Sequence, residues 1–147
     1  MSLVAYVVFG AAPALNGPVR EATAMVTAWL LGLVGTTASG DGALLSAGSL
    51  RFAVVPDCTP AGPLLLLSGA ILAFPARIRA KLIGLAVGAL ALTALNFLRL
   101  VTLVLIGLAR PEALEIAHLV VWQSVMILAA ITLWIAWLRR YGRGVPA

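Results

Sequence analysis

Long apolar runs separated by short polar connections dominate the pattern of this chain. One run occupies residues 81–110 and carries Asn96 and Arg99 within continuing hydrophobic sequence. Two others, residues 61–75 and about 113–138, also approach or exceed the roughly 18 residues that mark a candidate membrane helix. Each of the three runs predicts a membrane span.

The N-terminal part is harder to assign. Residues 1–15 form a short apolar stretch, bounded by Pro13 and by the turn-like residues 16–18 (Asn-Gly-Pro). This stretch is a short first membrane span or part of a longer one. Residues 19–35 predict a helix with apolar residues on one side, which spans the membrane or lies in its interface.

Glycines and serines alternate with short β-like pieces between residues 36 and 57. The segment ALLSAGSLRFAVV predicts a small hairpin that turns at residues 47–49, just before Cys58. Open sheet edges are not tolerated against lipid, so we expect the hairpin at the membrane surface or against protein. The fold class expected is an all-α polytopic membrane protein, residues 1–147 as one domain, with about four to five membrane helices and an extracytoplasmic hairpin-like segment.

Composition supports this class, because 63% of the residues are hydrophobic, 10% are charged and the mean hydropathy is +1.11. A net charge of +5 would suggest nucleic acid in a soluble chain, but the positive charges gather in two clusters at the ends of apolar runs. These clusters predict cytoplasmic loops, a lipid bilayer as partner and no nucleic acid. They consist of Arg77, Arg79 and Lys81, and of Arg139, Arg140 and Arg143. No basic region precedes the first apolar stretch, so we expect no secretory signal peptide.

Three reactive or polar side chains are predicted to share one depth in the membrane. Cys58, Arg99 and His118 each lie about 18–21 residues from a basic cluster. At 1.5 Å per helical residue this is roughly 27–32 Å, close to the hydrocarbon thickness. The only cysteine and the only histidine would therefore meet a deep arginine near the extracytoplasmic face.

Each residue also has a structural interpretation. Cys58 can be a small apolar filler, His118 an interfacial residue, and Arg99 a side chain that snorkels to the interface. Together, however, they fit acyl transfer on a peptide. A thiolate is a nucleophile that a nearby cation favours, histidine carries protons, and arginine stabilises an oxyanion or orients a carbonyl. One cysteine and one histidine are too few strong ligands for a metal, so no metal or other cofactor is expected.

The order Cys58-Thr59, FPARIRAKLIGLAVGALALTALNFLRL and AHLVVWQ resembles the exosortase/archaeosortase family of membrane cysteine transpeptidases, over roughly residues 35–137. The resemblance implies Cys58, Arg99 (in Asn96-Phe97-Leu98-Arg99) and His118 as catalytic residues. It also implies substrates that are exported proteins ending in a short motif, a transmembrane helix and a basic tail. Such a protein would be cleaved near the motif and transferred to another acceptor.

One departure concerns the residues after the cysteine. The family has a glycine soon after it, whereas this chain has Thr59, Pro60, Ala61 and then Gly62. Because proline has no N–H, Pro60 cannot donate to an oxyanion, so that role falls to the amides of residues 58 and 59 or to Arg99.

Three further residues are predicted to assist or bind substrate. Asn96 orients Arg99 or the substrate, or simply packs in its helix. Glu115 lies three residues before His118 and fixes its tautomer, or is simply solvated. Thr59 adjoins the nucleophile.

Two other functions remain open. The alternative function is a non-catalytic helix-packing membrane subunit or scaffold. The G-x-x-x-G spacing of Gly84 and Gly88 predicts helix packing for the enzyme and the scaffold alike. A small transporter component ranks last, because transporters need polar groups near the midplane, and here they gather toward one face.

Overall fold

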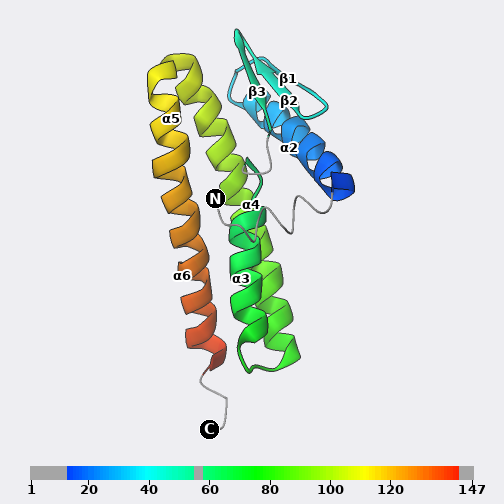
Figure 1. Ribbon diagram of the computed structural model, residues 1–147, viewed down its shortest axis with the longest axis vertical. Coiled ribbons are helices and arrows are strands. Elements are labelled where there is room, and N and C mark those ends of the chain that lie inside the picture. Colours follow the sequence, from blue (N-terminus) through cyan, green and yellow to red (C-terminus); the bar gives the residue numbers. More distant parts are fainter. Residues whose placement is uncertain (1–12, 55–57, 143–147) are drawn as a thin grey trace.

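The computed structural model describes residues 13–54 and 58–142, and in it three packed helices carry a small sheet and a further helix at one end (Figure 1). The elements in chain order are α2 (Pro13–Leu33), β1 (Ala38–Asp41), β2 (Leu44–Ala47), β3 (Leu50–Ala53), α3 (Ala61–Ala73), α4 (Ile78–Ala109), η2 (Pro111–Ala113), α5 (Leu114–Ile116), η3 (Ala117–Trp122) and α6 (Gln123–Tyr141). The predicted first apolar segment lies mostly outside the described residues.

Helices α3, α4 and α6 pack against one another and enclose the larger hydrophobic core. Its fully buried members include Ile71 from α3, Leu92 from α4 and Ala130 from α6. Near the basic end of the bundle, Trp137 Nε1 donates a hydrogen bond to the Ala80 carbonyl at 2.8 Å. An indole satisfied in this way can be buried without leaving its N–H unpaired.

The two glycines of the G-x-x-x-G spacing lie where side chains of neighbouring helices pack directly against α4. A Cβ atom at Gly84 would lie 2.5 Å from Trp137 of α6, and one at Gly88 would lie 2.3 Å from Leu67 of α3. The predicted role of both glycines in helix packing is therefore confirmed. Because this chain's own side chains occupy both positions, the spacing does not call for a partner helix.

Two helices in the described part of the chain are long and apolar enough to cross a membrane. They are Ile78–Ala109 and the continuous helical stretch Pro111–Tyr141. Helix α3 has 13 residues, or about 20 Å, and is too short to cross by itself. The predicted number of four to five membrane helices is thus not confirmed.

The predicted hairpin is confirmed and forms part of a larger sheet. Strands β2 and β3 pair antiparallel, with Ala47 opposite Leu50 across a turn in which Gly48 has a φ of 56°. This positive φ is a conformation that glycine adopts without strain. Strand β1 extends the sheet to the order β1-β2-β3. The sequence analysis missed it.

Helix α2 begins earlier than predicted, at Pro13, and runs through the residues expected to form a turn. Proline is favoured at the first helical position, and the fixed φ of Pro18 suits a helix at the loss of one hydrogen bond. One face of α2 packs against β1, β2 and α4. This second core includes Leu31 of α2, Leu45 of β2 and Val104 of α4. The sheet is thereby fixed to the end of α4 that is remote from the two basic clusters.

Candidate active site

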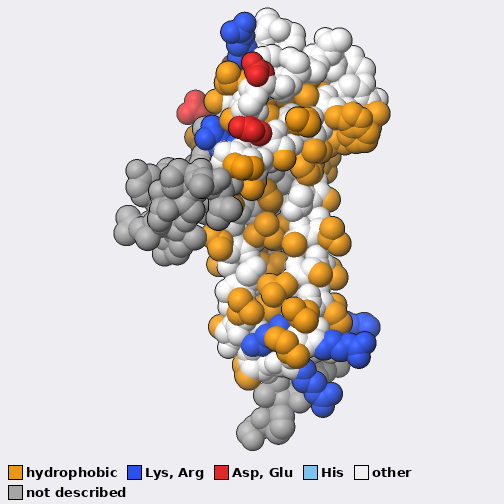
Figure 2. Space-filling view, turned by 90° about the vertical axis from the view of Figure 1, so that its right-hand side faces the viewer, with side chains coloured by type: hydrophobic (Ala, Val, Ile, Leu, Met, Phe, Trp, Pro, Cys, Tyr) orange, Lys and Arg blue, Asp and Glu red, His pale blue; other side chains and the backbone are white. Residues whose placement is uncertain are grey.

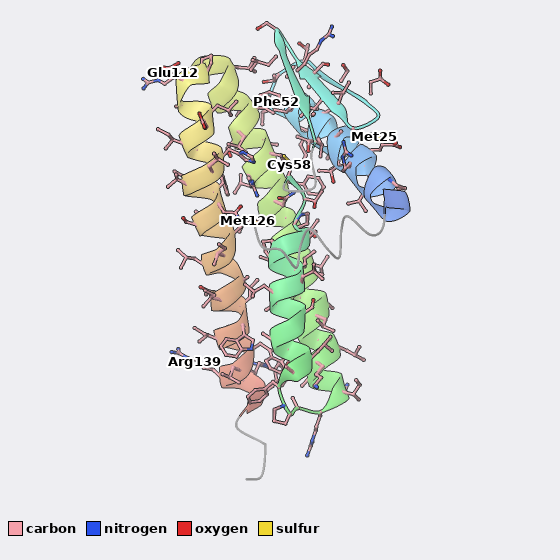
Figure 3. The ribbon with its side chains drawn as sticks, in the orientation of Figure 1. Met25, Phe52, Cys58, Glu112, Met126 and Arg139 are labelled. Atoms are coloured by element: carbon pink, nitrogen blue, oxygen red, sulfur yellow. The ribbon has the colours of Figure 1, made fainter. Side chains whose placement is uncertain are left out.

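Cys58 lies in the turn just before α3 and is half-buried beside α4 (Figure 3). The side-chain amide of Asn96 on α4 donates from Nδ2 to the Cys58 backbone carbonyl at 3.0 Å. This bond ties the turn to a helix 38 residues further along the chain. It sets the depth of the cysteine against α4.

Asn96 and Arg99 lie in the buried stripe of α4, with only 1% and 2% of their surfaces exposed. Their predicted position on one helical face is confirmed. Arg99 lies one turn further from the basic end than Asn96, and its backbone carbonyl accepts a hydrogen bond from Thr102 Oγ1 at 2.9 Å. The bundle thus encloses a guanidinium group close to the level of the Cys58 turn.

The residues that follow Cys58 begin helix α3. Thr59 is 5% exposed, and Pro60 is the N-cap residue, whose carbonyl accepts the backbone N–H of Leu64 at 2.9 Å. The N-terminus of a helix carries a partial positive charge, which favours an anion nearby. The Cys58 turn therefore lies at the electropositive end of α3.

His118 lies in η3, a π-helical turn between α5 and α6. The residue is half-buried and its Nε2 atom is fully buried. Segment η3 packs against α4, on which Asn96 and Arg99 lie. Glu115, one turn before His118, is exposed to solvent.

A side-chain hydrogen bond joins Asn96 to the backbone of Cys58. The structure places Arg99 in the same buried stripe as Asn96, and His118 on a segment that contacts the same helix. Asn96 lies 18 residues after Ile78, the first residue of α4, or about 27 Å from the basic end. The catalytic roles of Cys58, Arg99 and His118, and the substrate-binding or supporting roles of Asn96, Thr59 and Glu115, stay predictions.

Two features of the site escaped the sequence analysis. The hydrogen bond to the Cys58 carbonyl has no local signature, since its partners lie on different elements. The π-helical turn at His118 likewise has no marker such as proline or glycine within AHLVVW. π-Helical turns are rare in proteins, and those that occur often lie at functional sites.

Within residues 13–54 and 58–142, no group of three or more His, Cys, Asp or Glu side chains could hold a metal ion.

The chain belongs to the transmembrane exosortase family, because the model of that family matches residues 1–138. Searches of the curated proteins and of the solved structures returned no significant match. Family membership agrees with the two long apolar helices, α4 and the helical stretch that ends with α6. The protein is therefore a membrane protein.

Proposed function

We propose that this chain is a membrane-embedded cysteine transpeptidase that cleaves the C-terminal sorting signals of exported proteins by acyl transfer through Cys58. The observation that carries the proposal is the hydrogen bond from Asn96 to the Cys58 carbonyl, which holds the only cysteine against the helix that bears Arg99. Membership of the transmembrane exosortase family supports the reaction class.

The reaction proceeds in two halves. The Cys58 thiolate attacks the scissile carbonyl carbon, and Arg99 stabilises the oxyanion that forms. The C–N bond then breaks, the protonated imidazole of His118 gives its proton to the leaving amine, and a thioester remains on Cys58. An acceptor attacks the thioester, His118 takes the acceptor's proton, and the thiolate is regenerated. An amine acceptor makes the enzyme a transpeptidase, and water makes it a protease.

Arginine suits the oxyanion role at this position. It stays protonated in a low-dielectric site and offers donors in a fixed planar arrangement. Pro60 has no N–H to contribute, so Arg99 and the backbone amides of residues 58 and 59 supply the donors. Burial in the bundle strengthens such an interaction, because the local dielectric constant is low.

We place the active site on the extracytoplasmic side. Most of the lysine and arginine side chains visible in Figure 2 gather at the lower end of the bundle, whereas the acidic side chains and a few basic ones lie toward the upper end. The positive-inside rule assigns the basic end to the cytoplasm. Helix α4 has 32 residues, or about 48 Å, so its remote end and the attached sheet extend past a 30 Å hydrocarbon layer.

The test uses the purified chain in lipid vesicles together with Cys58→Ala and Cys58→Ser. A reporter protein fused to the C-terminal sorting signal of an exported protein from the same cell is reconstituted with each, and cleavage is followed by mass. We expect processing by the parent chain and none by Cys58→Ala, and the mass of the new terminus identifies the acceptor. Processing that is unchanged in Cys58→Ala would contradict acyl transfer through Cys58. Labelling of Cys58 by a membrane-impermeant maleimide in intact cells tests separately whether the cysteine faces the extracytoplasmic side.

A further inference from the structure

We infer that the side-chain oxygen of Asn96 is a recognition group for a peptide N–H beside Cys58, so that Asn96 positions both the nucleophile and its substrate. The inference rests on the proposed function, because it takes the ligand to be the backbone of the peptide that Cys58 attacks. It assigns Asn96 a positioning role distinct from the proton and charge chemistry of Arg99 and His118.

The two polar atoms of the Asn96 amide have different surroundings. Nδ2 donates to the Cys58 carbonyl at 3.0 Å. Oδ1 is buried and accepts no hydrogen bond from any described residue, and the whole residue is 1% exposed. The oxygen and nitrogen of one amide lie about 2.3 Å apart, so Oδ1 is within about 5.5 Å of the Cys58 carbonyl oxygen. An acceptor that receives no hydrogen bond from the described residues therefore lies close to the Cys58 backbone.

A buried acceptor without a donor is rare in proteins and unfavourable in an apolar interior. A residue that served only to hold the Cys58 carbonyl would need one donor, which a hydroxyl supplies. Asparagine adds an acceptor that is neutral, and it therefore introduces no negative charge beside the thiolate. The ligand that matches this acceptor is an N–H group, and an extended peptide presents one at every residue except proline.

The experiment compares two alkylating reagents that differ in their amide hydrogens. Iodoacetamide carries two N–H groups, whereas 2-iodo-N,N-dimethylacetamide carries none. Because the chain has one cysteine, intact mass gives the alkylation rate of Cys58 directly. The rate of each reagent with Cys58 is divided by its rate with glutathione, which corrects for the intrinsic reactivity of the reagent. The corrected rate of iodoacetamide divided by the corrected rate of the dimethyl reagent is the normalised ratio.

We expect a normalised ratio of about 5–10 for the parent chain in detergent, since one hydrogen bond of ordinary net strength corresponds to this factor. In Asn96→Ala the ratio falls to near 1, and in Thr93→Val, a loss of one polar group a turn away on α4, it stays at the parent value. If Asn96→Ala does not fold, Asn96→Leu replaces it, because the leucine side chain has the same branched arrangement of four heavy atoms as asparagine.

Three results would overturn the inference. A parent ratio near 1 shows that no acceptor recognises the N–H groups, and this result needs no variant. A high ratio that persists in a folded Asn96 variant assigns recognition to another group. If neither reagent alkylates Cys58 in the folded parent chain, a larger peptide cannot reach the cysteine either. None of these results bears on processing by Cys58→Ala, so the inference and the proposed function fail independently.

Discussion

Alanine in place of Gly84 perturbs the contact that holds α4 against α6. Its Cβ would lie 2.5 Å from Cδ1 and Nε1 of Trp137 and 3.1 Å from Cδ1 of Ile71. The Trp137 ring cannot move away easily, because Nε1 donates to the Ala80 carbonyl at 2.8 Å and the ring meets Phe74 edge-on at 5.9 Å between centroids. The substitution therefore displaces a side chain that is fixed on two sides.

The expected cost follows from opposing contributions. Overpacking of a core costs about 1–3 kcal/mol. Loss of the indole hydrogen bond adds about 1 kcal/mol, and the better helix propensity of alanine returns about 1 kcal/mol. We expect Gly84→Ala to lower the free energy of unfolding by about 1–3 kcal/mol. The matched control is Gly69→Ala in α3, where a Cβ meets nothing within 4 Å, so that only the propensity gain remains.

The assay is reversible unfolding in mixed dodecyl maltoside and SDS micelles, followed by circular dichroism. Gly84→Ala is expected to unfold at a lower SDS fraction than the parent chain, and Gly69→Ala at an equal or higher one. Equal stability of the two variants would refute the packing argument. It would mean that α4 and α6 do not approach each other at Gly84.

Two other changes test the proposed active site. Arg99→Lys is expected to slow reporter processing by about 10²-fold or more, because lysine lacks the planar set of donors. The control Arg110→Lys, at the exposed end of α4, is expected to process the reporter within about twofold of the parent rate. Equal rates for the two variants would remove Arg99 from the mechanism. Deletion of Val120 from η3 is expected to restore α-helical winding and to rotate His118 by about 100° relative to α6. This rotation is expected to abolish reporter processing without preventing membrane insertion. Processing that is retained in the same vesicles would show that the π-helical turn does not orient the histidine.

The sequence predicted those features that depend on local pattern. Strands β2 and β3 were identifiable because apolar residues flank the Gly48-Ser49 turn. Strand β1 (Ala38–Asp41, ASGD) was not, since it has no large apolar residue. It forms by pairing with β2, and its Gly40 lies against the backbone of α2, where a Cβ would be 3.2 Å from Ala24.

Contacts between distant elements could be predicted only as shared faces or depths. The spacing of Asn96 and Arg99 predicted one face of a helix, and both lie in the buried stripe of α4. The same spacing carried no information about which backbone group Asn96 would bind. The predicted depth of Cys58 treats every residue between Cys58 and Arg77 as helical, whereas α3 has 13 residues and the others belong to the turn before it and to the connection to α4. The hydrogen bond between Asn96 and Cys58 supplies what the residue count could not.

The central claim, acyl transfer through Cys58, is tested most directly by trapping the intermediate. The parent chain and the reporter are mixed in vesicles, quenched with acid after short times, and digested for mass analysis of the peptide that contains Cys58. We predict an adduct equal to the acyl part of the reporter, which appears before the product and is released by hydroxylamine, as a thioester is. Reporter cleavage without any such adduct, at an unchanged rate in Cys58→Ala, would contradict the account.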